Sequence, residues 1–560
     1  MLIKYYKNQM FRSFIRNLLL IYFLLISSIS FSQKPNIIWI TVEDISPTLS
    51  MYGDSTAKTP NLDELASESL IFTEAFTTVG VCSPSRSSLI TGMYPVSIGT
   101  HQMRTGKDVF GWGSRDYDGV SNAIDVNGDS IPLHSVVTPP EVKCFTEYLR
   151  AEGYYCTNNS KTDYQFAAPV TAWDQNGNSA HWKNREKNQP FFSVFNFDVT
   201  HESKMWLHRD KPLTVKPGLV PLPPYFPDTE TVRNDVARNY SNIELLDKMV
   251  GNLIKELKAD GLFDKTYIFF FSDHGGPLPR GKRSHYESGL KVPMMVRDPY
   301  EKKIRYVDDQ ISFVDLAPTT LSLTGLNIPD HFQGRAFMGE KKSEILRDYV
   351  FGSGDRFDET YDRVRSVISK EFIYVKNYYT NRPAYKDVLY RKNIDMTNEM
   401  LMLYKEDKLN SDQKYWYRES KTREEFYVRS EDPHSLKNLI SDERYEDEIN
   451  KHRMALKNWQ DEINDIGAKS EKKHLDSMWP RGIQPKSSKP DVTVKDKMVT
   501  IKSNTLGSSN AFIISDNDFE PSLDDGWKLY NEPIKVNKGY IYIISTRLGY
   551  EDSEIIKIKL

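Results

Sequence analysis

Short apolar runs alternate with helix-compatible stretches through the N-terminal half of the chain, and each run ends in polar residues. The clearest runs span residues 37–42, 154–156, 191–195 and 267–271. Buried strands of a parallel sheet have this continuous apolar character, and the intervening helical stretches indicate βαβ units. The pattern therefore predicts an α/β fold whose mixed, mostly parallel sheet lies between helices.

Polar clusters follow all four predicted strands. In chain order they are Glu43-Asp44, Ser160-Lys161-Thr162-Asp163, Thr200-His201 and Ser272-Asp273-His274. One such cluster alone is typical of an ordinary strand-to-loop transition. Because ligands of open α/β sheets bind beyond the carboxyl ends of the strands, four clusters at that position predict one shared pocket.

The C-terminal half predicts smaller units. A charged stretch at 352–359 leads toward a subdomain with an antiparallel sheet, and 481–490 has the Pro, Ser and Lys content of a linker. Alternating β-rich runs then predict a small β-sandwich. Its ending Gly549-Tyr550-Glu551-Asp552-Ser553 is similar to a chitobiase-type C-terminal module, which would pack on the preceding domains or capture carbohydrate. We expect a larger domain over 33–345, a subdomain over 346–480, a linker over 481–490 and an accessory module over 491–560.

Residues 1–32 combine basic residues with the apolar run 18–26 and then small polar residues. This is typical of a secretory signal peptide cleaved near Ser32-Gln33, which predicts a periplasmic or secreted protein. A retained N-terminal anchor is the alternative, although the apolar run is short for a full span. No later segment is expected to cross a bilayer.

Charge and cysteine content narrow the function classes. The net charge of −3 comes from 74 basic and 77 acidic residues, which argues against a nucleic-acid partner or a general polyanion surface. An anionic substrate must therefore be held by a local basic pocket. Three cysteines do not make a disulfide framework. Cys144 and Cys156 are candidates to pair, but their spacing does not decide it.

Residues 82–92 read Cys-Ser-Pro-Ser-Arg-Ser-Ser-Leu-Ile-Thr-Gly. This segment resembles the signature of type I sulfatases of the alkaline phosphatase superfamily. In that family the cysteine is oxidised to formylglycine by a formylglycine-generating or anaerobic sulfatase-maturing enzyme. The alternative is a helix-opening loop with a buried free cysteine. A helix after Cys82 would place an anion-favouring N-terminus at that residue.

The resemblance implies roles for residues of the polar clusters. Cys82 would supply the hydrated aldehyde that attacks sulfur, and Arg86 would stabilise its deprotonated hydroxyl. Lys161 and Lys282 would hold the sulfate oxygens, Lys282 within a segment similar to the family's GK-x-x-x-x-E-x-G motif. His201 would protonate the leaving alcohol, which suits an imidazole.

The resemblance also implies one divalent metal ion. Its ligands would be Glu43, Asp44, Asp273 and His274. Hard oxygen ligands favour Ca²⁺. Glu replaces the family's usual Asp and His its usual Asn, so Mn²⁺ or another divalent ion stays open.

The lysine motif departs from the family pattern G-K-x-H, since it reads Ser160-Lys161-Thr162-Asp163. Asp163 or His101 could replace the missing histidine as a base. Further candidates for substrate contacts are Arg104, Asp355, Arg356 and Asp358, with a solvated loop as the alternative for the last three.

The implied fold is that of alkaline phosphatase. The implied function is hydrolysis of sulfate esters on a sulfated polysaccharide or oligosaccharide, with O- and N-sulfates both open and inorganic sulfate released. Two alternatives remain at this point: a phosphonate or phosphate ester hydrolase of the same superfamily, and a catalytically silent glycan-binding protein.

Overall fold

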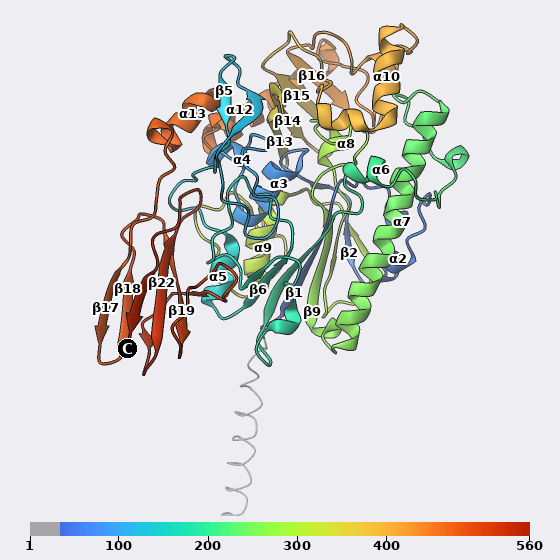
Figure 1. Cartoon of the computed structure of the whole chain (residues 1–560). Coiled ribbons are helices and arrows are strands. Elements are labelled where there is room, and N and C mark those ends of the chain that lie inside the picture. The colour runs from blue at the N-terminus through green and yellow to red at the C-terminus, as the bar shows by residue number, and fades with distance from the viewer. Residues whose placement is uncertain (1–33) are drawn as a thin grey trace, which may run out of the picture. The chain divides into compact units, whose positions relative to one another are not determined.

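An eight-stranded mixed sheet forms the centre of the computed structural model, which describes residues 34–560 (Figure 1). From edge to edge its strands are β11 (Arg305–Val307), β2 (Leu70–Phe72), β10 (Met294–Arg297), β9 (Thr266–Ser272), β1 (Asn36–Val42), β8 (Phe191–Phe197), β6 (Tyr155–Asn159) and β7 (Gln175–Asn176). β1 pairs in parallel with β8 and β9, and β6 pairs in parallel with β8. The four predicted strands are therefore confirmed, and they are neighbours. β10 runs antiparallel to β9.

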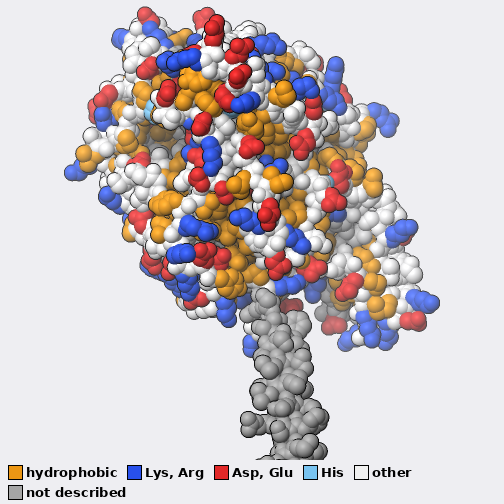
Figure 2. Space-filling view, turned by 180° about the vertical axis from the view of Figure 1, so that it is seen from behind, with side chains coloured by type: hydrophobic (Ala, Val, Ile, Leu, Met, Phe, Trp, Pro, Cys, Tyr) orange, Lys and Arg blue, Asp and Glu red, His pale blue; other side chains and the backbone are white. Residues whose placement is uncertain are grey.

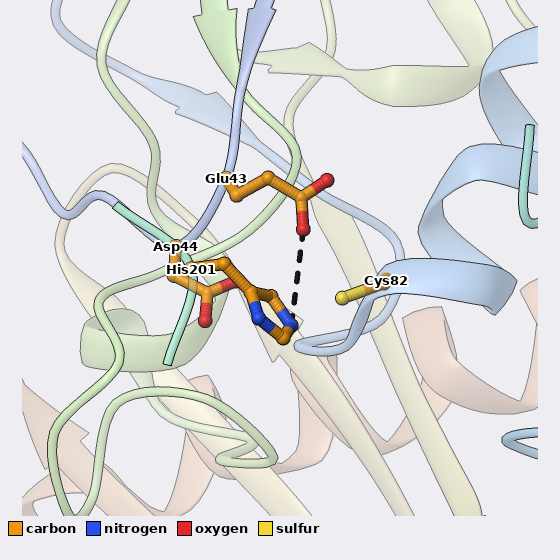
Figure 3. Close-up of side chains that lie close together, drawn as sticks. All are labelled: Glu43, Asp44, Cys82 and His201. Atoms are coloured by element: carbon orange, nitrogen blue, oxygen red, sulfur yellow. Dashed lines mark ion pairs between the residues drawn. The ribbon is translucent and has the colours of Figure 1, made fainter. Parts of the chain in front are cut away.

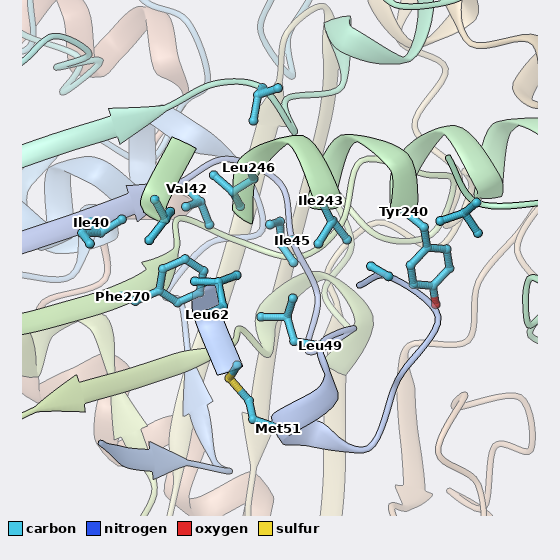
Figure 4. Packing of buried hydrophobic residues seen from close by; sticks show 14 of the residues in the cluster. Ile40, Val42, Ile45, Leu49, Met51, Leu62, Tyr240, Ile243, Leu246 and Phe270 are labelled. Atoms are coloured by element: carbon cyan, nitrogen blue, oxygen red, sulfur yellow. The ribbon is translucent and has the colours of Figure 1, made fainter. Parts of the chain in front are cut away.

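Helices cover both faces of this sheet. They include α2 (Pro60–Ala66) and α7 (Glu230–Ala259) on one face, and α3 (Cys82–Thr91), α5 (Phe145–Ala151) and α9 (Leu316–Leu323) on the other. Ile40 and Val42 of β1 pack with Ile243 and Leu246 of α7 (Figure 4), whereas Trp39 packs in the opposite cluster. Because both faces are buried, β1 is mainly apolar, as the sequence pattern predicts.

The predicted helix after residue 82 is α3, and Cys82 is its first residue. Val81 caps it in an extended conformation, and Gly92 ends it at φ 67°. The helix is buried on every side although it is rich in serine. Its hydroxyl groups bond internally, as when Ser85 donates to the Asp273 carbonyl at 2.6 Å. These bonds fix the helix against the ends of the central strands.

A four-stranded antiparallel sheet follows. Its strands are β13 (Val350–Phe357), β14 (Thr360–Ile368), β15 (Phe372–Asn377) and β16 (Glu424–Val428). Its alternate side chains enter two different clusters. Val367 packs toward α12 (Glu446–Glu462), whereas Val364 packs toward Leu290 of α8 (Glu287–Leu290). Further helices are α4 (Pro95–Ile98), α6 (Ser203–Leu207), α10 (Asp395–Lys405), α11 (Ser411–Lys414) and α13 (Glu471–Met478).

The β-rich tail forms two more antiparallel sheets. Their strands are β17 (Asp491–Lys495), β18 (Met498–Lys502) and β21 (Ile534–Lys535) in one sheet, and β20 (Lys528–Leu529), β19 (Ser509–Ser515), β22 (Tyr540–Thr546) and β23 (Ile556–Lys559) in the other. Val499 and Ile541 belong to the core that the two sheets share, as expected of a sandwich. Ile513 and Tyr542 instead pack with Val170 of the larger unit. The module thus packs against the rest of the chain through a hydrophobic contact.

The remaining sequence predictions concern the N-terminal segment, the domain boundaries, membrane spans, the cysteines and the surface charge. The predicted signal peptide lies outside the described residues, and the domain boundaries stay predictions. Within residues 34–560, none of the helices has the length and apolar character needed to span a bilayer. Cys144 and Cys156 are both buried and free, so they form no disulfide. Figure 2 shows acidic and basic side chains interspersed over one face, in keeping with the near-neutral net charge.

Candidate functional site

A cavity of about 400 Å³ opens where the central parallel strands end. Its lining includes five residues that the sequence predicts for the site: Glu43, Arg104, Lys161, His201 and Lys282. Loops after β1, β6 and β8 supply three of them, because parallel strands place their carboxyl ends at one edge of the sheet. The predicted convergence of the clusters is therefore present in the structure.

Glu43 follows β1 and is buried among cations. One carboxylate oxygen accepts from Arg86 Nη2 at 2.5 Å, and the other accepts from Lys161 Nζ at 2.7 Å. Figure 3 shows the carboxylate directed toward His201, whose Nε2 lies 3.9 Å away. Burial raises the pKa of Glu43, but Lys161 and Arg86 outweigh it, so the pKa lies well below its usual value. Glu43 is therefore ionised.

Asp44 has a different set of partners. Both its carboxylate oxygens lie within 3.0 Å of Lys282 Nζ, and one also accepts the backbone N–H of Glu202 at 2.7 Å. Its own N–H donates to Asp273 Oδ1 at 3.2 Å. Burial raises the pKa of Asp44 despite the attraction of Lys282 and His274. The loop after β1 is thereby tied to the loop after β9.

Cys82, at the start of α3, faces Glu43, Asp44 and His201 (Figure 3). Its Sγ is 3.3 Å from His274 Nε2 and is fully buried. Burial raises the pKa of the Cys82 thiol to about 12, although Lys161 and Lys282 oppose the shift. The unmodified side chain is thus a neutral thiol at neutral pH.

Arg86, one turn after Cys82, connects several elements of the site through its guanidinium group. Its Nε donates to Asp273 Oδ2 at 3.2 Å, and its Nη1 donates to Asn196 Oδ1 at 2.7 Å. With its bond to Glu43, one guanidinium joins loops or strands from β1, β8 and β9. The fixed fork of donors on arginine suits this task better than a lysine would.

Two overlapping groups of side chains are arranged as metal ligands. Their potential ligand atoms lie within 4.8 Å of one another: Glu43, Asp44, Cys82 and His201 in one group, and Asp44, Cys82, Asp273 and His274 in the other. His274 Nδ1 bonds to the Gly275 carbonyl at 2.9 Å, so it carries the proton. Nε2 then faces Asp44 at 3.2 Å and Asp273 at 3.5 Å. Of the four predicted ligands, Asp44, Asp273 and His274 thus share one group, and Glu43 belongs to the other, which also contains Asp44. Carboxylate oxygens with one imidazole nitrogen fit a divalent cation.

His201 lines the cavity with one ring nitrogen fixed. Its Nδ1 accepts the backbone N–H of Ser203 at 3.3 Å, so the proton of the neutral ring is assigned to Nε2. Burial lowers the pKa of His201 well below its usual value, and Lys282 adds to this effect. A neutral ring with Nε2–H toward the cavity is the resulting arrangement.

Glu202 and Arg283, which the sequence did not single out, also line the cavity, as does Asp358, one of the predicted candidates for substrate contacts. Glu202 accepts two bonds from Arg283 at 2.8 and 2.9 Å, and Arg283 also donates to Asp358 at 3.0 Å. Glu202 and Arg283 adjoin His201 and Lys282 in the sequence, which is the only signal that could have indicated them. Asp358 lies in the turn between β13 and β14, far from both in sequence.

Asp163 lies next to the nucleophile position. It accepts a bond from Ser83 Oγ and is 3.6 Å from Lys161 Nζ. Burial raises its pKa, but Arg104 and Lys161 outweigh burial and lower it.

His101, Asp355 and Arg356 are not among the residues that line this cavity. Asp355 and Arg356 lie within β13 and are buried, so the alternative of a solvated loop is wrong there. Arg356 makes a two-bond ion pair with Glu471 at 2.6 and 2.7 Å. Asp355 pairs with Arg365 at 3.0 Å, and His101 Nε2 is 3.8 Å from Asp355. Internal ion pairs, rather than substrate, satisfy these charges.

Comparison with known proteins decides the family. The family model described as Sulfatase matches residues 35–326. The chain belongs to the sulfatase family. A second model, N-sulphoglucosamine sulphohydrolase C-terminal, matches residues 280–414 of this sulfatase. An ulvan-active sulfatase of Formosa agariphila is 38% identical over 94% of this chain and 91% of its own length. The enzyme is thus a sulfuric ester hydrolase, and the predicted family is confirmed.

More distant relatives agree. Human N-sulphoglucosamine sulphohydrolase is 27% identical over 79% of this chain and 93% of its own length. A solved structure described as a complex with D-glucosamine-2-N,6-O-disulfate superposes with a TM-score of 0.55 at 15% identity, over 77% of this chain and 99% of that one. At that identity the likeness supports the fold alone, and it confirms the predicted alkaline-phosphatase-like architecture.

The buried pair of Arg356 and Glu471 makes a stability prediction. Replacing Arg356 with Met leaves Glu471 ionised and unpaired in the interior, which we expect to lower the free energy of unfolding by about 3–5 kcal/mol. Denaturant titration of the full chain measures this. Lys457→Met, which removes an exposed helix pair with Asp461, should cost under about 1 kcal/mol. Equal losses in the two variants would contradict the structural role of Arg356.

Proposed function

We propose that this sulfatase hydrolyses sulfate esters on a sulfated polysaccharide or oligosaccharide and releases inorganic sulfate. The observation that carries the proposal is the position of residue 82, at a helix N-terminus and within the charge fields of Lys161 and Lys282. Relatives whose names specify ulvan and N-sulphoglucosamine support a carbohydrate substrate. A location in the periplasm or outside the cell, where such polymers occur, belongs to the same proposal.

The proposal includes the oxidation of Cys82 to formylglycine by a formylglycine-generating or anaerobic sulfatase-maturing enzyme. The hydrated aldehyde supplies one hydroxyl to attack sulfur and a second through which the sulfate is later expelled. Because residue 82 is fully buried, the maturing enzyme must reach it before the fold closes. Arg86 contributes a fixed positive charge one helical turn away.

A divalent cation held by Glu43, Asp44, Asp273 and His274 is part of the proposal. Bound there, it would withdraw charge from a sulfate oxygen and from the nucleophile. The carboxylate oxygens favour Ca²⁺, and the imidazole nitrogen leaves room for Mn²⁺ or another divalent ion.

The chain's own residues then divide the remaining tasks. Lys161 and Lys282 attract the sulfate oxygens, and each is already charged through a carboxylate partner. The Nε2–H of His201 donates a hydrogen bond toward the departing sugar oxygen. Full proton transfer uses the imidazolium form, which the negative charge of a bound sulfate and of Glu43 favours. Of the two candidate bases, Asp163 lies beside Lys161 and Ser83, whereas His101 lies beside Asp355. We assign the base to Asp163 for this reason.

The nucleophile is tested by Cys82→Ala. We expect release of sulfate from sulfated oligosaccharides to fall by roughly four orders of magnitude or more, because the attacking group is removed. Ion chromatography of released sulfate measures the rate, and mass spectrometry of the wild-type peptide should show formylglycine at residue 82. Cys144→Ala, another buried free cysteine, is the control and should stay active.

Two results would refute the proposal. Cys82→Ala could hydrolyse the oligosaccharides as fast as the wild type, or the wild type could strongly prefer an aryl phosphate diester to an aryl sulfate. The second result would favour the phosphate ester hydrolase.

The metal site is tested without an activity assay. Asp44→Asn and Asp273→Asn each remove one ligand charge, so we expect bound Ca²⁺ or other divalent metal to fall from about one per chain to well below half. Elemental analysis of the purified protein after dialysis measures it. Asp198→Asn is a matched control, because Asp198 lines the same cavity but pairs with Lys204. Full metal retention in both ligand variants would exclude this site.

The role of His201 is tested by comparing two substrates whose leaving groups differ in their need for a proton. His201→Gln removes the proton donor, so turnover of a sugar sulfate should fall by about 100- to 1,000-fold. Turnover of 4-nitrophenyl sulfate should fall much less, because its leaving oxygen needs less protonation. His181→Gln, outside the cavity, should change neither rate. Equal losses on both substrates would show that His201 does not act as the acid.

A further inference from the structure

Arg104 differs from the other cationic side chains of the cavity. Lys161, Lys282 and Arg283 each form an ion pair with a carboxylate of the site. Arg104 lines the same cavity, yet within the described chain it makes neither an ion pair nor a side-chain hydrogen bond. Its backbone has φ 61°, a left-handed conformation that is costly for arginine. The cavity wall therefore includes one guanidinium without a protein partner.

The acidic groups near Arg104 are already occupied. Asp163 bonds to Ser83 and lies beside Lys161, and Asp358 bonds to Arg283. Burial lowers the pKa of Arg104, but the negative charges of Asp163 and Asp358 outweigh this effect and raise it. The side chain is therefore charged. A charged, half-buried guanidinium without a close partner is stabilised when an anion binds to it.

Two exposed aromatic rings line the same cavity. Phe110 is 58% exposed, and its backbone bridges to Lys161. Tyr390 is 43% exposed, and its ring centre lies 6.4 Å from that of His201. Aromatic faces offer apolar area against which the C–H face of a sugar ring packs. A sugar with its sulfate at residue 82 can thus have its other substituents near Arg104.

We propose that Arg104 binds a second anionic group of the substrate, a carboxylate or a second sulfate on the same or the adjoining sugar. This inference rests on the proposed function and narrows it to carbohydrates that carry at least two negative groups. The planar fork of the guanidinium accommodates both anions with two bonds. Lys161 and Lys282 serve the sulfate that is cleaved, and Arg104 selects the sugar that carries it.

Binding to the Cys82→Ala chain tests the inference, because no turnover is needed. Isothermal titration would compare a sulfated uronic-acid disaccharide with its carboxyl-reduced form, and glucosamine 2-N,6-O-disulfate with glucosamine 6-O-sulfate. We expect one of the dianionic sugars to bind about 10- to 100-fold tighter than its partner. A difference within the uronic-acid pair identifies the second group as a carboxylate, and a difference within the glucosamine pair identifies it as a second sulfate.

Arg104→Met in the same background should abolish that preference, and Arg104→Lys should retain part of it. Lys107→Met is the matched control: it removes an exposed cation of the same loop and should leave the preference intact. A preference that is absent from the parent chain, or that survives in Arg104→Met, overturns the inference. Sulfate release by the wild type is scored separately, so failure of the proposed function is recognised on its own.

Discussion

The buried carboxylate of Glu43 is the constraint on which the site depends. An ionised carboxylate in the interior is tolerated only when well-placed cations satisfy it, and loss of a partner is strongly destabilising. Its partners Arg86 and Lys161 come from α3 and from the loop after β6. Satisfying one charge therefore fixes the distance between a helix N-terminus and two strand ends. The position of Cys82 follows from that arrangement.

The parallel pairing of β6, β8, β1 and β9 makes this arrangement available. Strands in one direction deliver their following loops to one edge, so acids, lysine and histidine from distant sequence positions meet without long connections. β10 runs the other way, and its following loop lies at the opposite edge of the sheet. None of the predicted site residues follows β10 directly, as this geometry requires. The mixed sheet thus separates strands that build the site from strands that only complete the core.

The sequence predicted the central strands and α3 from their patterns, and it predicted the metal-ligand candidates and His201 because they follow apolar runs. Cys82, Arg86 and Lys282 were indicated by motifs instead. The sequence could not predict which charges satisfy one another across long separations. Arg356 and Asp355 looked available to a substrate, but Glu471 and Arg365 neutralise them inside the fold. Asp358, the third candidate of this segment, does line the cavity, as does its neighbour Glu359. The local sequence pattern predicts a strand and its turn. It does not show which of the charged side chains are paired inside the fold and which face the cavity.

A chain of contacts joins the reactive centre to the smaller sheet. The backbone of Glu202 holds Asp44, its carboxylate holds Arg283, and Arg283 holds Asp358 in the turn after β13. The loops after the larger sheet therefore supply the groups around residue 82. The turn after β13, with Asp358, and the loop that carries Arg104 supply the outer wall of the cavity. Changes in the outer wall can alter which sugar enters without displacing Glu43 or Arg86. The buried charges around residue 82 and the more exposed outer wall are thus held by different contacts, so a substitution in one does not remove the ion pairs of the other.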